Sequence, residues 1–180
     1  VRSIENFLEI PIHHYIALDW HSFAKIIDEM GGINLYVEKD MTYKDPELNL
    51  DINIKQGYKN LSGLEAAKYV RFCSDELGEV GRVKRQQKLL KVMLDEFVKI
   101  DSIAKLPKLV DIINHQITTS LSMYDIATLV KSLKGIKPEV LTTEMLSGNI
   151  VYVQNKDVWL TDKEKVNGQI ERMFINQSTE

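Results

Sequence analysis

The sequence has little cysteine, no long apolar run and no excess of positive charge. Only Cys73 is a cysteine among 180 residues, which excludes an internal disulfide framework and fits either the cytosol or the outside of a cell. The net charge of −3 argues against nucleic-acid binding by broad phosphate neutralisation. No apolar run approaches the roughly 18 residues of a membrane span and no signal peptide begins at Val1. We therefore expect a soluble chain, with any membrane anchor upstream of it.

The composition predicts one globular domain over residues 1–180, because 44% hydrophobic residues can form a substantial core. Alternating strand and helix patterns, without repeats or low-complexity linkers, predict an α/β or α+β fold. The expected helices are Ser3–Leu8, Trp20–Met30, Ile103–Asn114, Ser122–Lys134 and Asp162–Phe174. The expected strands are Tyr15–Leu18, Ile33–Val37, Leu48–Ile54, Val140–Leu146 and Asn149–Val153. The last two are expected to form a hairpin. Lys39–Glu47 is expected to be a turn-rich segment and Gly57–Leu61 a connection.

The stretch from Ser62 to Leu90 has the most informative pattern. Ser62 and Glu65 form a capping box, which predicts a short helix. The alternation in Lys68–Phe72 then predicts a strand, and the glycine-containing segment Ser74–Gly81 an acidic loop. Helical periodicity predicts a long helix from about Arg82 to Lys99.

Positive charge at the start of this long helix is unfavourable for the helix dipole. Five bases and no acid occur between Arg82 and Lys91. Arg82, Arg85 and Gln86 would share one face of the first turn, where free backbone N–H groups also point outward. Together these groups are typical of a phosphate or pyrophosphate site. The alternative is a solvated basic face paired with the acidic loop.

A spaced set of motifs resembles the LytR-CpsA-Psr (LCP) family. The residues that carry the resemblance are Leu61–Gly63, Ala67, Tyr69–Phe72, Asp75, Gly78 and Gly81–Gln87, with further similarity at Tyr15–Asp19, Phe23, Ile27 and Gly31–Ile33. This resemblance implies a three-layer αβα sandwich with a mixed central sheet, of which the chain would be the C-terminal two-thirds.

The resemblance also implies a function. LCP proteins are membrane-anchored enzymes of the bacterial envelope, on the extracellular face of the cytoplasmic membrane, chiefly in Gram-positive cells. They transfer glycopolymers of the teichoic acid or capsule type from a polyprenyl-pyrophosphate carrier to peptidoglycan. The family motif places the pyrophosphate at Arg71, Arg82, Arg85 and Gln86, with Gln87 as a weaker candidate.

Two positions depart from the family pattern. Cys73 replaces the second arginine of the Arg-x-Arg motif, which removes one bidentate phosphate contact. Glu79 replaces an aspartate and keeps the charge. Asp75 and Glu79 are the nearby carboxylates that could support the site, although pairing with the neighbouring bases is the simpler role for both.

The family's magnesium-binding aspartates have no counterpart in this sequence, so Mg²⁺ is implied as a cofactor without ligands in this chain. We also expect no metal site at His13 and His14, because adjacent strand residues face opposite sides. In the expected reaction a peptidoglycan sugar hydroxyl attacks at the pyrophosphate linkage, and the arginines neutralise the leaving polyprenyl pyrophosphate.

Two other functions stay open at this stage. A non-catalytic module that binds polyprenyl phosphates would keep the arginines and dispense with the aspartates. A transcriptional attenuator or regulator, as in the older family naming, would need a basic recognition helix, for which Arg82–Lys91 is the candidate. We expect no nucleic acid as a partner.

Overall fold

The computed structural model describes residues 1–98, 117–133, 142–154 and 156–175. These residues form two compact units, one made of residues 1–13 and 143–180 and the other of residues 14–142, within the described ranges. The expected helix at Ile103–Asn114 lies outside the described residues. Because helices and strands are mixed, the expected α+β class is confirmed.

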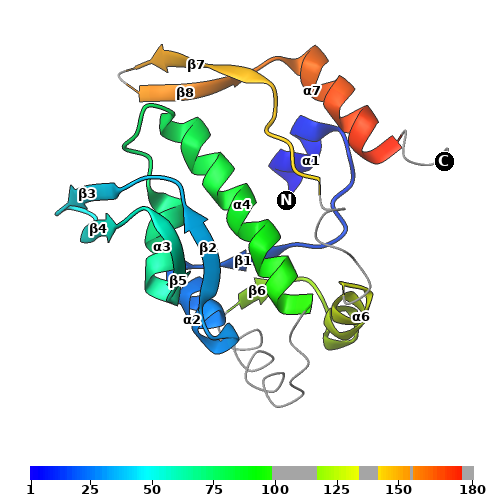
Figure 1. Cartoon of the computed structure of the whole chain (residues 1–180). Coiled ribbons are helices and arrows are strands. Elements are labelled where there is room, and N and C mark those ends of the chain that lie inside the picture. The colour runs from blue at the N-terminus through cyan, green and yellow to red at the C-terminus, as the bar shows by residue number, and fades with distance from the viewer. Residues whose placement is uncertain (99–116, 134–141, 155, 176–180) are drawn as a thin grey trace. The chain divides into compact units, whose positions relative to one another are not determined.

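The second unit contains most of the elements (Figure 1). In chain order they are β1 (Ile16–Leu18), α2 (Trp20–Met30), β2 (Ile33–Val37), β3 (Met41–Asp45), β4 (Leu50–Ile54), β5 (Gly57–Leu61), α3 (Gly63–Arg71), α4 (Gly78–Val98), β6 (Ile117–Thr119) and α6 (Met123–Leu133).

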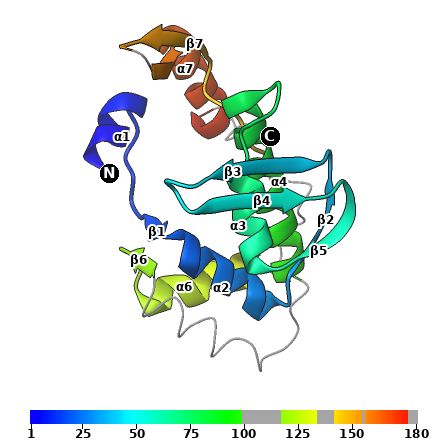
Figure 2. The ribbon, with the colours of Figure 1, turned by 90° about the vertical axis from the view of Figure 1, so that its left-hand side faces the viewer.

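A long antiparallel ribbon is the centre of this unit. β2 pairs with β5 and β3 with β4, so the four strands follow one another as two arms of one hairpin (Figure 2). β1 pairs with β6, also antiparallel. The described strands therefore form two-stranded antiparallel pairs, and the expected mixed central sheet is not seen among them. A parallel pair would need a crossover connection, whereas the ribbon strands are joined by tight turns.

One face of the ribbon carries the hydrophobic core. Alternate residues of β2 and β4 are buried, and they meet apolar residues of α2, α3 and α4. The core consists of Ile27, Ile33, Leu35, Val37, Met41, Leu50, Ile52, Ile54, Leu61, Ala66, Tyr69, Val70, Phe72 and Leu89. This packing holds α3 and α4 against the ribbon.

Local signals fix the ends of α2 as predicted. The Asp19 carboxylate accepts a hydrogen bond from the Ser22 amide at 2.7 Å. Gly31 ends the helix with φ of +97°, a conformation that favours glycine. Both signals depend only on neighbouring residues, which is why the sequence predicts them.

Three predictions for the ribbon and α3 are wrong. Met41–Asp45 was expected in a turn-rich segment and Gly57–Leu61 in a connection, but both are strands, since each has a partner strand along the ribbon. Lys68–Phe72 was expected to be a strand, but α3 continues through Arg71. The capping box starts this helix and its apolar residues recur at helical spacing, which outweighs the strand preference of Tyr69 and Val70.

The first unit consists of α1 (Arg2–Leu8), β7 (Gly148–Val153), β8 (Lys156–Thr161), α7 (Lys163–Ile170) and η2 (Glu171–Ile175). β7 forms a hairpin with β8 and not with the described residues of the preceding segment, so the predicted hairpin around Ser147 and Gly148 is wrong. The predicted strand at Val140–Leu146 is wrong within the described residues 142–146, which have no strand pairing. The buried Gln169 explains this, because its amide donates to the Glu144 carboxylate and the Met145 carbonyl and so holds the segment along α7.

Within the described ranges, no helix has the length and apolarity needed to cross a bilayer.

Candidate functional site

The candidate site lies where α3 ends and α4 begins. α4 starts at Gly78, not at Arg82, so the prediction that Arg82, Arg85 and Gln86 occupy its first turn is wrong. Gly78 and Gly81 belong to this helix and not to the predicted acidic loop. The Gly81 amide already donates a hydrogen bond to the Leu77 carbonyl at 3.2 Å. The free N–H groups of the helix start therefore precede the arginines.

Gly81 allows a close approach at this point. A Cβ atom there would lie 2.9 Å from Asp75 Oδ1 and 3.1 Å from an Arg85 terminal nitrogen. The absence of a side chain thus makes room for the pair formed by Asp75 and Arg85.

Arg85 is the buried centre of an ion-pair network. Its side chain is 3% exposed, and its Nη1 donates to Asp75 Oδ2 at 2.7 Å. Its Nη2 donates to the Phe72 carbonyl at 2.6 Å, and its guanidinium lies 5.2 Å from the Phe72 ring centroid. Arg85 therefore joins α4 to the backbone that follows α3, and both terminal nitrogens have protein acceptors.

The Asp75 carboxylate is ionised in this network. Burial raises its pKa, but the hydrogen bond and charge of Arg85 lower it by more, so the net shift is below the usual range. The carboxylate also accepts from the Leu77 amide at 3.2 Å, next to the start of α4. Asp75 thus has the ion-pair role that the sequence favoured.

Arg82 is more accessible than Arg85. Its side chain is 41% exposed and pairs with Glu79 one turn earlier, as the simpler interpretation predicted. The Nε atoms of Arg82 and Arg85 are both buried and have no hydrogen-bond partner within the described residues. The exposed terminal part of Arg82 is therefore the part of this side chain that a bound anion could reach.

Gln86 on α4 contacts the end of α3, next to Arg71 in the sequence. Gln86 Nε2 donates to the Val70 carbonyl at 3.3 Å, so it contacts the residue before Arg71. The Arg71 guanidinium lies 5.5 Å from the Trp20 ring centroid. Among the described residues no carboxylate pairs with Arg71, which leaves its positive charge available to a ligand.

The remaining predicted residues border this cluster. Cys73 is a half-buried free thiol just beyond α3, and Gln87 is half-buried on α4. Lys84 and Lys91 are exposed, and the Lys88 ammonium lies 3.3 Å from a Glu38 oxygen.

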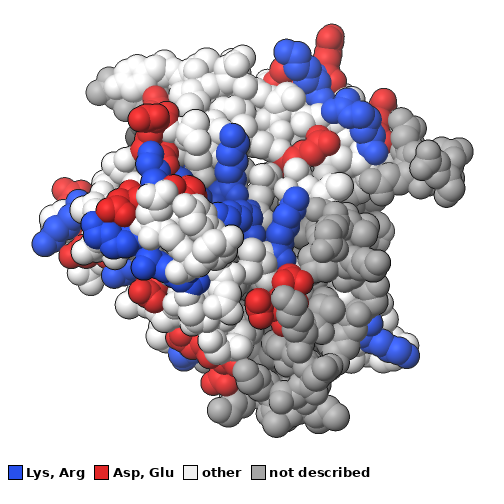
Figure 3. Space-filling model, in the orientation of Figure 1, with Lys and Arg blue, Asp and Glu red and all other residues white. Residues whose placement is uncertain are grey.

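Figure 3 shows basic and acidic side chains intermingled over the ribbon and α4 on this face, without a broad basic surface.

Sequence reasoning missed Glu38, which lies between β2 and β3. Its carboxylate accepts from the Tyr69 hydroxyl at 2.9 Å and lies 3.6 Å from Arg85 Nη1. Burial raises the pKa of Glu38, but backbone and Tyr69 hydrogen bonds and the charge of Lys88 bring the net shift below the usual range. The only signal in the sequence is that three charged residues, Glu38–Asp40, interrupt the strand alternation.

Comparison with known proteins gives the same family as the motifs. The model of the LytR_cpsA_psr family matches residues 1–175. The chain is 28% identical over 169 residues to the polyisoprenyl-teichoic acid–peptidoglycan teichoic acid transferase TagV of Bacillus subtilis, covering 93% of the chain and 43% of that protein. It is 33% identical over 122 residues to the regulatory protein MsrR of Staphylococcus aureus, covering 67% of the chain and 36% of that protein. The chain thus spans less than half the length of these relatives.

Solved structures agree with this result. The crystal structure of B. subtilis TagV has a TM-score of 0.74 and 27% identity, with 94% of this chain and 66% of that one covered. TagT bound to LI-WTA has a TM-score of 0.71 at 17% identity, covering 96% of this chain and 64% of that one, which shows a shared fold. The match over nearly the whole chain, with the clustered motif residues, shows that this chain belongs to the LytR-CpsA-Psr family.

Proposed function

We propose that the chain binds the pyrophosphate of a polyprenyl-linked glycopolymer and serves its transfer to peptidoglycan. The observation that carries the proposal is the hydrogen bond from Gln86 of α4 to the Val70 carbonyl of α3, which brings the backbone next to Arg71 close to the part of α4 that carries Arg82. The name of TagV, a teichoic acid transferase, supports the choice of an anionic glycopolymer of the teichoic acid or capsule type. An action at the extracellular face of a bacterial cytoplasmic membrane is part of the same proposal.

The side chains of the candidate site would have different roles in binding the pyrophosphate. Arg71 and Arg82 are partly accessible and would make charge-assisted hydrogen bonds to phosphate oxygens. Gln86 would orient an oxygen by hydrogen bonding. Arg85 is buried, so it would contribute positive charge from behind the site rather than a direct contact.

The reaction that fits this site is phosphoryl transfer. A sugar hydroxyl oxygen would bond to the phosphorus next to the glycopolymer while the bond from that phosphorus to the polyprenyl phosphate breaks. The leaving group of this step is polyprenyl phosphate, not the polyprenyl pyrophosphate expected from the sequence, because attack at phosphorus breaks the pyrophosphate bridge. Negative charge grows on this leaving group, and Arg71 and Arg82 would stabilise it. The proton of the hydroxyl passes to a base that the described residues do not identify.

Magnesium does not fit the residues described here. Throughout those ranges, no three histidine, cysteine, aspartate or glutamate side chains are grouped to hold a metal ion. We propose that the ligands for a family magnesium ion lie outside the described residues.

The lack of a ligand set in the described ranges also favours a second candidate function, the binding of polyprenyl phosphates without turnover. DNA binding is supported less well, because acidic and basic side chains are intermingled over the ribbon and α4 on the face shown in Figure 3, without a broad basic surface.

Calorimetric titration with farnesyl pyrophosphate, a short soluble polyprenyl pyrophosphate, tests the proposal, with and without Mg²⁺. Arg71→Ala and Arg82→Ala should each weaken binding about tenfold or more, because each removes a charge-assisted contact. Arg172→Ala, which removes an exposed arginine of η2, is the matched control and should leave binding unchanged. Equal affinity in all four proteins would refute the proposed site.

A further inference from the structure

Glu38 occupies an irregular point of the β-ribbon. Val37 pairs with Gly57 and Met41 pairs with Ile54, so the three residues 38–40 oppose the two residues 55–56. One extra residue on one strand is the mark of a β-bulge, which often redirects a side chain. Regular alternation would place Glu38 on the same face as the exposed Tyr36.

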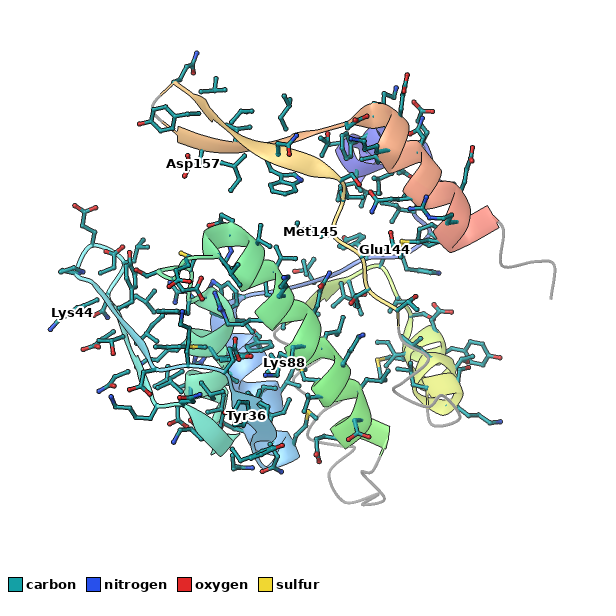
Figure 4. All side chains as sticks on the ribbon, turned by 45° about the horizontal axis from the view of Figure 1, so that its top comes forward. Tyr36, Lys44, Lys88, Glu144, Met145 and Asp157 are labelled. Carbon is teal, nitrogen blue, oxygen red and sulfur yellow. The ribbon has the colours of Figure 1, made fainter. Side chains whose placement is uncertain are left out.

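The bulge turns the Glu38 carboxylate toward the two helices of the site. Oε2 accepts from the Tyr69 hydroxyl of α3 at 2.9 Å and lies 3.3 Å from Lys88 Nζ of α4. Oε1 lies 3.6 Å from Arg85 Nη1. Lys88 also donates to the Tyr36 carbonyl, and Figure 4 shows these two residues adjacent.

Through Arg85, these contacts connect Glu38 to the side chains that are predicted to bind the anion. Arg85 is held by Glu38 on one side and donates to Asp75 and the Phe72 carbonyl. Phe72 directly follows Arg71. Arg85 is also three residues after Arg82 and one before Gln86 on α4.

Two effects of Glu38 on anion binding have opposite signs. As a nearby negative charge, it would weaken the attraction of a phosphate. Because Glu38 connects the ribbon to the helices, it would strengthen binding by holding the anion-binding side chains in one geometry. The observed geometry favours the second effect, because the carboxylate contacts three side chains from two helices and two of them, Tyr69 and Arg85, are almost fully buried.

We propose that Glu38 is a positioning residue that acts through Arg85 and Lys88 to hold Arg71, Arg82 and Gln86 in place for a pyrophosphate. This inference rests on the proposed function. It assigns a role to a residue outside the motif that carries the family resemblance.

Binding of inorganic pyrophosphate to Glu38→Gln tests the proposal, with Asp51→Asn as control. Both variants remove one negative charge, and Asp51 is exposed on β4 of the same ribbon. We expect about fivefold to tenfold weaker binding in Glu38→Gln, despite its more positive charge. Asp51→Asn should differ from the unaltered chain by less than about twofold, since an exposed distant charge is screened by salt.

Tyr69→Phe is a second variant that keeps the charge of Glu38 and removes the hydroxyl that holds it. It should weaken binding about twofold to threefold, as expected for one lost hydrogen bond in the network. It also keeps the test decisive if Glu38→Gln does not fold. All titrations are done well below the thermal midpoint of each variant, where a purely stabilising role leaves the Kd unchanged.

Amide hydrogen exchange without ligand gives an independent readout. Loss of the Glu38 contacts should speed amide hydrogen exchange in residues 70–72 and 78–86 of Glu38→Gln. The exchange of Asp51→Asn should not change. Failure of the unaltered chain to bind pyrophosphate would overturn the proposed function and this inference with it. Binding by the unaltered chain, with equal or tighter binding and unchanged exchange in Glu38→Gln, would overturn the positioning role alone.

Discussion

Gln86 on α4 donates a hydrogen bond to the carbonyl of Val70 on α3 at 3.3 Å. The contact joins residues 16 positions apart and places the third turn of α4 beside the end of α3. Two helices thereby contribute to one candidate site.

Replacement of Gln86 should therefore affect anion binding more than replacement of its neighbour. We expect Gln86→Ala to weaken farnesyl pyrophosphate binding about fivefold, because it removes a contact between the helices and a hydrogen-bond donor. Calorimetry of Gln86→Ala beside Gln87→Ala measures the difference. An equal loss in both variants would show that the contact has no special role.

The Arg71 side chain should depend on Trp20. The indole ring lies below the guanidinium at 5.5 Å, and a cation–π contact at a partly exposed position is worth about 0.5–1 kcal/mol. We expect Trp20→Leu to weaken pyrophosphate binding about threefold, whereas Trp20→Phe keeps an aromatic face and most of the affinity. Equal affinity of the leucine and phenylalanine variants would contradict the dependence on the aromatic face.

Breaking the buried pair should destabilise the protein strongly. Asp75 and Arg85 side chains are 4% and 3% exposed. Asp75→Ala removes the nearer carboxylate from the buried guanidinium and leaves only Glu38, at 3.6 Å, so it should cost about 3 kcal/mol or more. Glu79→Ala breaks an exposed pair with Arg82 and should cost less than about 1 kcal/mol. Urea unfolding of both variants measures the costs, and similar values would argue against the buried network.

The same pair gives the stability a pH dependence. The pKa of Asp75 is lower in the folded protein than its ordinary value, so its stabilising contribution is present above that ordinary value, near pH 4. The contribution is lost as the pH falls through the lowered pKa of the folded state. We expect the free energy of unfolding of Asp75→Asn to fall less below about pH 4 than that of the unaltered chain. Parallel curves would contradict this assignment.

Cys73→Arg should strengthen anion binding. It introduces the second arginine of the family motif at a half-buried position two residues from Arg71. A bidentate guanidinium contact should raise pyrophosphate affinity about tenfold. Cys73→Ser is the control for loss of the thiol, and a serine variant that binds as tightly as the arginine variant would refute the explanation.

The parts of the fold that follow local rules could be predicted from the sequence. The Asp19 cap, the Gly31 turn and the capping box at Ser62 each depend on residues within one helical turn. The C-terminal part of α3 was predicted as a strand, because Tyr69 and Val70 favour strands in isolation. Their burial against the ribbon, which determines the helix, is a tertiary property.

The site could be predicted only in part for the same reason. Motif spacing located the arginines, but it treated Arg82 and Arg85 alike. The structure separates them, because Arg85 faces the core and Arg82 does not. Glu38 was missed because its orientation depends on a bulge, and the bulge follows from the register of strands far apart in the sequence.

Chemical-shift mapping by NMR tests the central claim most directly. Titration of the labelled chain with farnesyl pyrophosphate should shift the amide signals of residues 70–72 and 82–86, and the side-chain amide of Gln86, with saturation. These shifts should be absent in Arg82→Ala at the same concentration. Saturable shifts confined to other residues, or no shifts at all, would contradict an anion site where α3 meets α4.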